Sequence, residues 1–295
     1  MVKLRSNHSK TRAFGGRLLL LVIGASIALT WFLTSFQEVL DAPREKADLT
    51  ELIVSEDPRW YLPSSTTDEV IYRDHYTLSY SENFEQAEWV AYKLTRSSLQ
   101  QPNVERTDWF EADPLIKQGS AHYKDYSGSG MTRGHLVPAA DMAFHEKAME
   151  ETFFMSNISP QDRAFNGGIW RELEEQVRKW TWDRGELIIV AGPVLNDGLK
   201  RIGRNEVAVP EQFYKIIFDE RDKEMLAFLI PNQKSERHLK GYAVSVDTLE
   251  MITGIDFFEQ SLADNDSLLE ISVDLAPWEF DDTKYRLRLE KWNDQ

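Results

Sequence analysis

The sequence of 295 residues contains no cysteine. This absence excludes a disulfide framework, a thiolate metal site and a cysteine nucleophile. It does not assign a redox compartment, because a chain with 42% hydrophobic residues can bury a large core without disulfides. A zinc site built from histidine and carboxylate ligands is also unsupported, since no pair of these residues has the standard spacing.

Positive charge is scarce as well. The chain has 34 Lys and Arg residues against 49 Asp and Glu residues, and a formal net charge of −15. This balance disfavours non-specific adhesion to nucleic acid by bulk electrostatics, so a polyanionic substrate has to be held by local groups. Acidic residues are in turn absent from residues 1–37, whose basic side chains are Lys3, Arg5, Lys10, Arg12 and Arg17.

Residues 18–36 are almost wholly apolar, and their number is close to the roughly 20 residues with which a helix spans a bilayer. Because the basic residues precede this run, the positive-inside rule predicts a cytoplasmic tail (1–17), a single-pass membrane anchor (18–36) and an extracytoplasmic remainder. That side would be periplasmic or extracellular, or the mitochondrial intermembrane space in a eukaryote. A cleaved signal peptide, or a mitochondrial presequence followed by an anchor, is the alternative.

The part of the chain after this run divides into a linker and a domain. Residues 37–61 are charged and contain two prolines, which is typical of a linker. Within 62–295, strand patterns occur at 70–72, 76–80, 89–94, 187–191, 213–218 and 225–230. Helical periodicity occurs at 146–151, 169–182 and 246–252. The pattern predicts an α+β fold with a mixed, mostly antiparallel sheet.

Residues 131–142 (MTRGHLVPAADM) hold the densest group of chemically able side chains. His135 stands between an Arg-Gly pair and an apolar pair that ends in proline. This pattern predicts a strand that ends in a turn and holds the imidazole near the surface. Such an imidazole is a candidate general base. We interpret Asp141 as structural, with a role as a second metal ligand as the alternative.

The helix predicted to begin near Asn166 has an apolar face and a polar shoulder beside it. At about 100° per residue, one narrow apolar face is formed by Ile169, Leu173, Val177 and Trp180. The shoulder of that face is formed by Asn166, Trp170, Glu174 and Arg178. An amide, a carboxylate and a guanidinium along one edge can together hold a hydrated metal ion and a phosphate. The alternative is an i,i+4 pair of Glu174 and Arg178 on the surface.

These motifs occur in a recognisable order: TRGH (132–135), PAAD (138–141), NISPQ (157–161), FN (165–166), Trp170, LE (173–174) and Arg178. The set resembles the DNA/RNA non-specific endonucleases of the ββα-metal (His-Me finger) class, the family that includes endonuclease G. Flanking blocks extend the resemblance over roughly residues 62–258. An ordered set of this kind is far more specific than a lone Arg-Gly-His.

The resemblance implies a ββα-metal active site that hydrolyses phosphodiester bonds of DNA and RNA. It implies His135 as the general base and Asn166 as the one direct protein ligand of a divalent metal, most often Mg²⁺, with Mn²⁺ as a substitute. Glu174 matches the carboxylate that orients the water molecules of the metal. The arginines that match those holding or neutralising the phosphate are Arg106, Arg133 and Arg178.

The sequence departs from the family pattern at Thr132, where the family usually has Asp. Threonine can accept a hydrogen bond, but it cannot supply a negative charge to orient a neighbouring arginine. Two alternatives to a membrane-anchored endonuclease therefore stay open: a catalytically degraded module that binds nucleic acid or a partner, and a structural membrane-anchored domain. The motifs fix neither a preference between DNA and RNA nor the formation of a homodimer.

Overall fold

The computed structural model describes residues 59–258 and 267–293. The tail, the anchor and nearly all of the linker expected from the sequence lie outside these ranges. Within them, no helix is both long enough and apolar enough to cross a bilayer.

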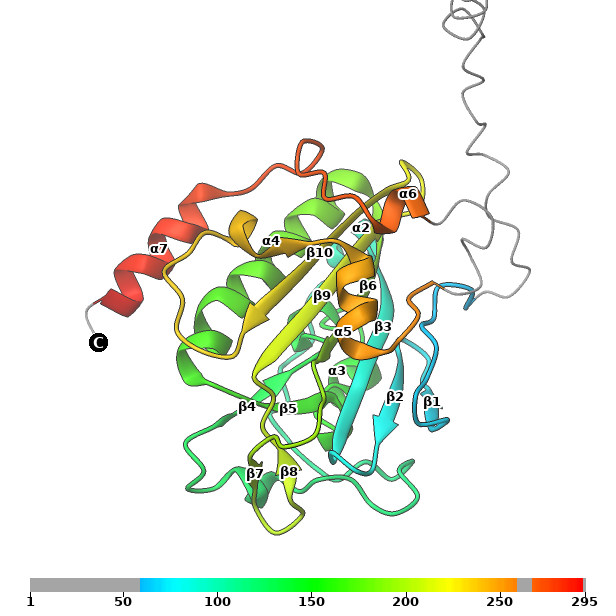
Figure 1. The fold of residues 1–295 in the computed structure, drawn as a ribbon, viewed down its shortest axis with the longest axis vertical. Helices are drawn as coiled ribbons and strands as arrows, with labels where there is room; N and C mark the ends of the chain where they lie inside the picture. Colours follow the sequence, from blue (N-terminus) through cyan, green and yellow to red (C-terminus); the bar gives the residue numbers. More distant parts are fainter. Residues whose placement is uncertain (1–58, 259–266, 294–295) are drawn as a thin grey trace, which may run out of the picture. The chain divides into compact units, whose positions relative to one another are not determined.

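One sheet of seven strands forms the centre of the fold (Figure 1). In spatial order its strands are β1 (Val70–Tyr72), β2 (Thr77–Ser81), β3 (Gln86–Thr95), β6 (Glu186–Pro193), β9 (Gln212–Asp219), β10 (Glu224–Pro231) and β11 (Ala243–Val244). Every neighbouring pair is antiparallel. The α+β prediction is confirmed, and this sheet is antiparallel throughout rather than mixed.

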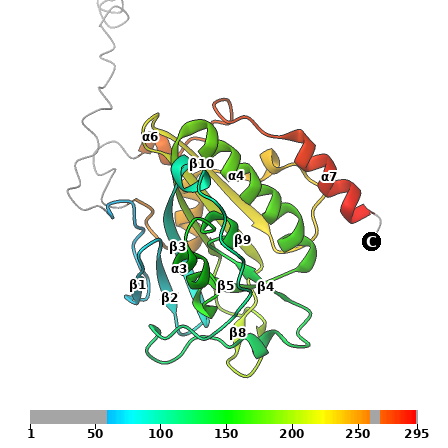
Figure 2. The ribbon, with the colours of Figure 1, turned by 180° about the vertical axis from the view of Figure 1, so that it is seen from behind.

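Both faces of the sheet are covered, which explains why its central strands have continuous apolar runs. Ile189 and Ile217 belong to the core cluster on the face of helix α4 (Arg171–Arg184). Ile188 and Ile216 belong to the cluster on the opposite face, with helix α5 (Val246–Thr253). Accordingly α5 lies in front of the sheet in Figure 1, and α4 lies in front of it in Figure 2.

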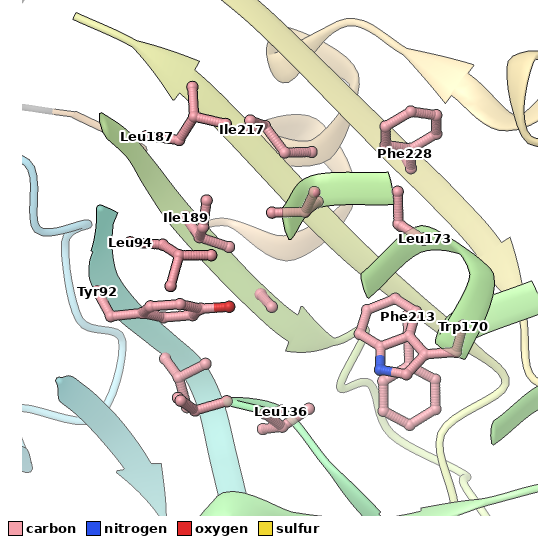
Figure 3. Packing of buried hydrophobic residues seen from close by; sticks show 14 of the residues in the cluster. Tyr92, Leu94, Leu136, Trp170, Leu173, Leu187, Ile189, Phe213, Ile217 and Phe228 are labelled. Carbon is pink, nitrogen blue, oxygen red and sulfur yellow. The ribbon is translucent and has the colours of Figure 1, made fainter. Parts of the chain in front are cut away.

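Helix α4 buries the apolar face expected from its periodicity, since Ile169, Leu173, Val177 and Trp180 are all at most 2% exposed. Figure 3 shows its start packed on the sheet, and the rings of Trp170 and Phe213 are 5.8 Å apart. The helix ends at Gly185, whose φ of 103° favours glycine. Its predicted first turn is instead the π-helical segment η5 (Phe165–Trp170), because the backbone of Gly168 departs from helical geometry.

A separate two-stranded ribbon lies beside the main sheet. Its strands are β4 (Thr132–His135) and β5 (Ile158–Gln161), paired antiparallel. Asn157 fixes the turn that follows β4: its Oδ1 accepts from the Val137 amide at 2.9 Å, and its Nδ2 donates to the carbonyls of Val137 and Thr152 at 3.0 and 2.9 Å. The chain therefore turns directly after His135, as the sequence predicts.

The other elements are short and connect these parts. They are α2 (Arg96–Leu99), η2 (Tyr123–Tyr126), η3 (Ala139–Asp141), α3 (Glu146–Glu151), η4 (Met155–Asn157), β7 (Arg201–Ile202), β8 (Val207–Ala208), η6 (Leu239–Tyr242), α6 (Ser267–Glu270) and α7 (Asp282–Asn293). Helix α7 is fastened to α4 by a buried pair, in which Nε of Arg288 donates to Oε2 of Glu172 at 2.5 Å.

Candidate active site

His135 is the last residue of β4, and its ring is half-buried between two phenylalanines. The ring centroids of Phe153 and Phe110 are 4.9 and 5.7 Å from that of the imidazole. Nε2 is buried and has no hydrogen-bond partner among the described residues. Nδ1 is therefore the ring nitrogen that can meet a solvent molecule. Trp170 donates from its indole to the His135 carbonyl at 3.4 Å, which links this strand to the start of α4.

The imidazole is neutral over the whole physiological range. Burial lowers the pKa of His135 to about 3, and the positive charges of Arg106 and Arg133 lower it in the same direction, while Asp108 opposes them. A neutral imidazole is in the correct state to accept a proton. Bringing a phosphate between these arginines and the ring would partly cancel their charge and raise its basicity.

Two of the three predicted arginines flank this imidazole. The guanidinium of Arg106 lies over the ring of Phe153 at 5.0 Å, and that of Arg133 lies over the ring of Phe110 at 4.2 Å. Arg106 also donates to Asp108 at 2.7 Å, but both side chains are at least half exposed, so water screens this pair. Arg133 forms no salt bridge with any described residue. Both guanidinium groups are thus available to an anion beside His135.

Asn166 lies in η5, where it is joined to the strand of His135 by one hydroxyl group. Its Nδ2 donates to Oγ1 of Thr132 at 2.9 Å, and that hydroxyl donates to the Gln161 carbonyl at 2.8 Å. With the amide nitrogen engaged, Oδ1 is the atom left for another ligand. Thr132 therefore orients the predicted metal ligand. The resemblance had implied that the residue at this position orients a neighbouring arginine.

Arg178 contacts a different carboxylate from the one considered in the sequence. Its Nη1 donates to Oδ1 of buried Asp141 at 2.7 Å, and the Tyr92 hydroxyl donates to Oδ2 of the same residue at 2.7 Å. The alternative of a Glu174–Arg178 surface pair is therefore wrong. Both oxygens of Asp141 are occupied by protein donors, which favours its structural interpretation over a role as metal ligand.

Lys215 of β9 belongs to the same cluster and was missed in the sequence. It is 1% exposed, and its Nζ lies 4.7 Å from the centre of the Trp170 ring without a hydrogen-bond partner among the described residues. Burial lowers its pKa, while the charges of Glu174 and Asp141 act in the opposite direction. The available signal was a single charged residue inside the otherwise apolar and aromatic strand 213–218.

Glu174 lies half-buried on α4, close enough to Lys215, Arg178 and Asp141 to interact with their charges. Burial raises its pKa to about 7, against the opposing effects of Lys215 and Arg178. Near neutral pH the group therefore changes between a carboxylic acid and a carboxylate. A raised carboxyl pKa next to a buried lysine is typical of functional sites.

The residues present fit a hard divalent cation. The amide oxygen of Asn166, oriented by Thr132, is an oxygen ligand of the kind that Mg²⁺ and Mn²⁺ accept, and Glu174 supplies a carboxylate on the following helix. A second acidic group lies elsewhere: the ligand atoms of Asp247, Glu250 and Glu270 are within 4.8 Å of one another on α5 and α6. Helix α5 covers the sheet face opposite α4, so this group is separate from the site of His135.

Residues 61–264 match the family model described as DNA/RNA non-specific endonuclease. The chain is 35% identical over 228 residues to a Danio rerio protein named "Nuclease EXOG, mitochondrial", covering 70% of this chain and 66% of that protein. It is 31% identical over 217 residues to human "Endonuclease G, mitochondrial", covering 68% and 73%. A Nostoc protein named "Nuclease" is 34% identical over 216 residues, covering 68% and 77%.

A solved structure is similar as well. The crystal structure of an EndoG/EndoGI complex, whose subject is the mechanism of EndoG inhibition, matches with a TM-score of 0.64 at 31% identity, covering 73% of this chain and 93% of that one. The chain spans just under two thirds of the Danio rerio relative and 58% of the human nuclease EXOG.

Proposed function

Because the chain belongs to the DNA/RNA non-specific endonuclease family, we propose that it hydrolyses phosphodiester bonds of DNA and RNA. The observation that carries this proposal is the hydrogen bond from Asn166 to Thr132. It joins the turn that holds the metal-ligand candidate to the strand that ends in the general-base candidate. Strands β4 and β5 with helix α4 are in this proposal the ββα-metal motif.

In the proposed reaction, His135 accepts a proton at Nδ1 from a water molecule whose oxygen attacks the phosphorus. One phosphorus–oxygen ester bond then breaks, and the departing sugar oxygen takes up a proton from solvent. This leaves a phosphate monoester on one fragment and a sugar hydroxyl on the other, and His135 returns its proton to solvent. Arg106 and Arg133 hold the phosphate beside the imidazole. Their positive charge also stabilises the negative charge that grows on the phosphate oxygens during attack.

Asn166 would hold a single Mg²⁺ or Mn²⁺ through Oδ1, with Glu174 orienting the water around it. When bound, such an ion supplies Lewis-acid stabilisation of charge on the phosphate and on the leaving oxygen. Arg178, fixed by Asp141, contributes positive charge at the edge of the site and acts on the ionisation of Glu174.

The test is cleavage by the purified full-length chain in detergent. Plasmid DNA and a structured RNA are incubated with Mg²⁺ or Mn²⁺, with and without a chelator. Fragmentation of both substrates that the chelator stops is the expected result. Intact DNA and RNA in the presence of either ion would disprove the proposal, and cleavage of only one polymer would remove its non-specific character.

The second candidate, a catalytically degraded binding module, makes the opposite prediction of nucleic-acid binding without turnover. It was motivated by Thr132 in the place of the family Asp. In the structure, the Thr132 hydroxyl supports Asn166 instead of leaving a gap. This contact favours the enzyme.

The proposal extends to the arrangement of the chain. A basic tail (1–17), a membrane anchor (18–36) and a linker (37–61) would precede the nuclease domain (62–295), which would lie on the extracytoplasmic side. The names of the mitochondrial relatives support a mitochondrial location, and in a eukaryote the proposed compartment is the intermembrane space. Resistance of the full chain to carbonate extraction would be expected and, in a eukaryote, protection from protease added outside intact mitochondria. Release into the soluble fraction would contradict the anchor.

A further inference from the structure

A pocket of about 870 Å³ opens beside Arg106 and is not used in the proposed reaction. Its volume is in the range of pockets that hold organic ligands. Trp109 lines it with 73% of its surface exposed, and Leu115 lines it with 48% exposed. Phe154 and Pro114 extend the apolar wall. Together these side chains form an exposed apolar area at one pocket, which is typical of a ligand-binding groove.

The charges of the pocket do not suit a phosphate. Four glutamates line it: Glu105, Glu111, Glu150 and Glu151. Each of its three cations has a carboxylate partner. Arg73 pairs with Asp113 at 2.5 Å in a buried contact, whereas the pairs of Lys147 with Asp74 at 2.5 Å and of Arg106 with Asp108 at 2.7 Å are exposed to water. A neutral ligand with N–H donors is therefore favoured over an anion, since carboxylates can only accept hydrogen bonds.

The pocket is continuous with the candidate active site through Arg106, which belongs to both. The guanidinium of Arg106 lies 5.0 Å from the ring of Phe153, whose centroid is 4.9 Å from that of His135. A polymer whose phosphate lies at Arg106 thus has its neighbouring nucleoside within reach of the pocket.

The loop that carries Trp109 is tied to the same support. The Glu111 amide donates to the Phe153 carbonyl at 3.3 Å, and the Met155 amide donates to the Glu111 carbonyl at 2.8 Å. These backbone bonds connect the loop to the segment that packs against His135. The backbone two residues after Trp109 is therefore held against the segment that packs on the imidazole.

We propose that this pocket is a nucleobase subsite in which Trp109 stacks on an unpaired base next to the phosphate held at Arg106. The inference rests on the proposed nuclease function and adds a substrate class to it. A base inside a duplex is already stacked on both faces and has its pairing edge occupied. An unpaired base offers its face to the indole and its N–H groups to the glutamates, so single-stranded and frayed nucleic acids are the preferred substrates.

The experiment couples one side chain to one base. A series of short, fluorescently labelled single-stranded DNAs, each with one abasic position, is bound by the full-length His135→Ala chain and cleaved by the full-length wild-type chain. Trp109→Ala should weaken binding and reduce kcat/KM on intact DNA by about tenfold. Trp109→Phe should retain most of both, because it keeps an aromatic face. Trp182→Ala is the matched control, since Trp182 is 48% exposed on α4 and does not line the pocket.

The expected signature is a single abasic position that harms the wild type about as much as Trp109→Ala does, with no further loss when the two changes are combined. Additive losses, or a Trp109→Ala chain that behaves like Trp182→Ala, would overturn the subsite while leaving the nuclease function intact. If the wild type cleaves nothing but the coupling is present in binding, the nuclease proposal fails and the subsite stands.

Discussion

His135 and Glu174 are both affected by burial and by two nearby cations, but their pKa values shift in opposite directions. At His135 both effects favour the neutral ring, and they bring its pKa down to about 3. At Glu174 burial favours the neutral acid whereas Lys215 and Arg178 favour the carboxylate, and the pKa settles at about 7. Nearby cations therefore act in the same direction as burial on the pKa of a base, and in the opposite direction on the pKa of an acid. Of these two groups, only Glu174 titrates near neutral pH.

The largest effect on activity is expected from removing the imidazole. His135→Ala should lower kcat by roughly 10²- to 10⁴-fold, the usual contribution of a positioned base. His145→Ala is the matched control, because His145 is exposed and its side chain caps no helix. Cleavage rates and circular dichroism of both variants provide the measurement. Activity of His135→Ala within a factor of a few of the wild type would refute the assignment of the base.

The pH profile separates the two groups. Because Glu174 is raised to about 7 and must be ionised to act, kcat/KM should fall by about tenfold per pH unit below pH 7. His135, at about 3, should cause no loss until far more acidic conditions. In Glu174→Gln the limb near pH 7 should disappear from the residual activity. Persistence of the same limb in that variant would assign it to another group.

Removing the buried cation should widen the difference between the pKa values of Glu174 and His135. Lys215→Met deletes the largest charge effect that lowers the pKa of Glu174, so the acidic limb should move to higher pH and activity at pH 7 should fall by about tenfold. Recovery at higher pH distinguishes this electrostatic role from a loss of folding. Lys179→Met, at a more exposed position on α4, is the control. An unmoved limb in Lys215→Met would show that Lys215 does not act on Glu174.

The smallest effect is expected at Thr132. Thr132→Val keeps the shape of the side chain but removes the hydroxyl from Asn166, and should reduce activity by about three- to tenfold at limiting metal concentration. Thr132→Ser keeps the hydroxyl and should remain close to the wild type. Titration of Mg²⁺ in the cleavage assay measures the effect. Equal metal dependence of the Val and Ser variants would count against a positioning role.

Most of the fold was predictable because its signals are local. The helix 146–151 and the helix that starts at Val246 and precedes Gly254 were found at nearly their observed limits. The strands 213–218 and 225–230 were found within a residue or two at each end. The π-helical turn before α4 was not predicted, because an apolar face with a period of 3.6 residues does not reveal the non-helical backbone of Gly168.

The candidate site residues could be named from the sequence, but the contacts between them could not. Arg178 pairs with Asp141, which is 37 positions away in the sequence, rather than with a residue on its own helix. Thr132 supports Asn166, which is 34 positions away. Such partners are brought together by the tertiary fold, and no local spacing rule reports them. Lys215 shows the same limit, since its neighbours Trp170 and Glu174 lie on two other elements, η5 and α4.

Gly134, between Arg133 and His135, has a consequence for how this ribbon can change. A Cβ at Gly134 would overlap the side chain of Gln161 on the opposite strand, which is fully buried and cannot swing into solvent. The two positions therefore form one unit of substitution: a larger residue at 134 requires a smaller one at 161. An engineer who wishes to reshape the approach to the imidazole has to vary both positions together, because either change made alone alters the ribbon on which His135 is held.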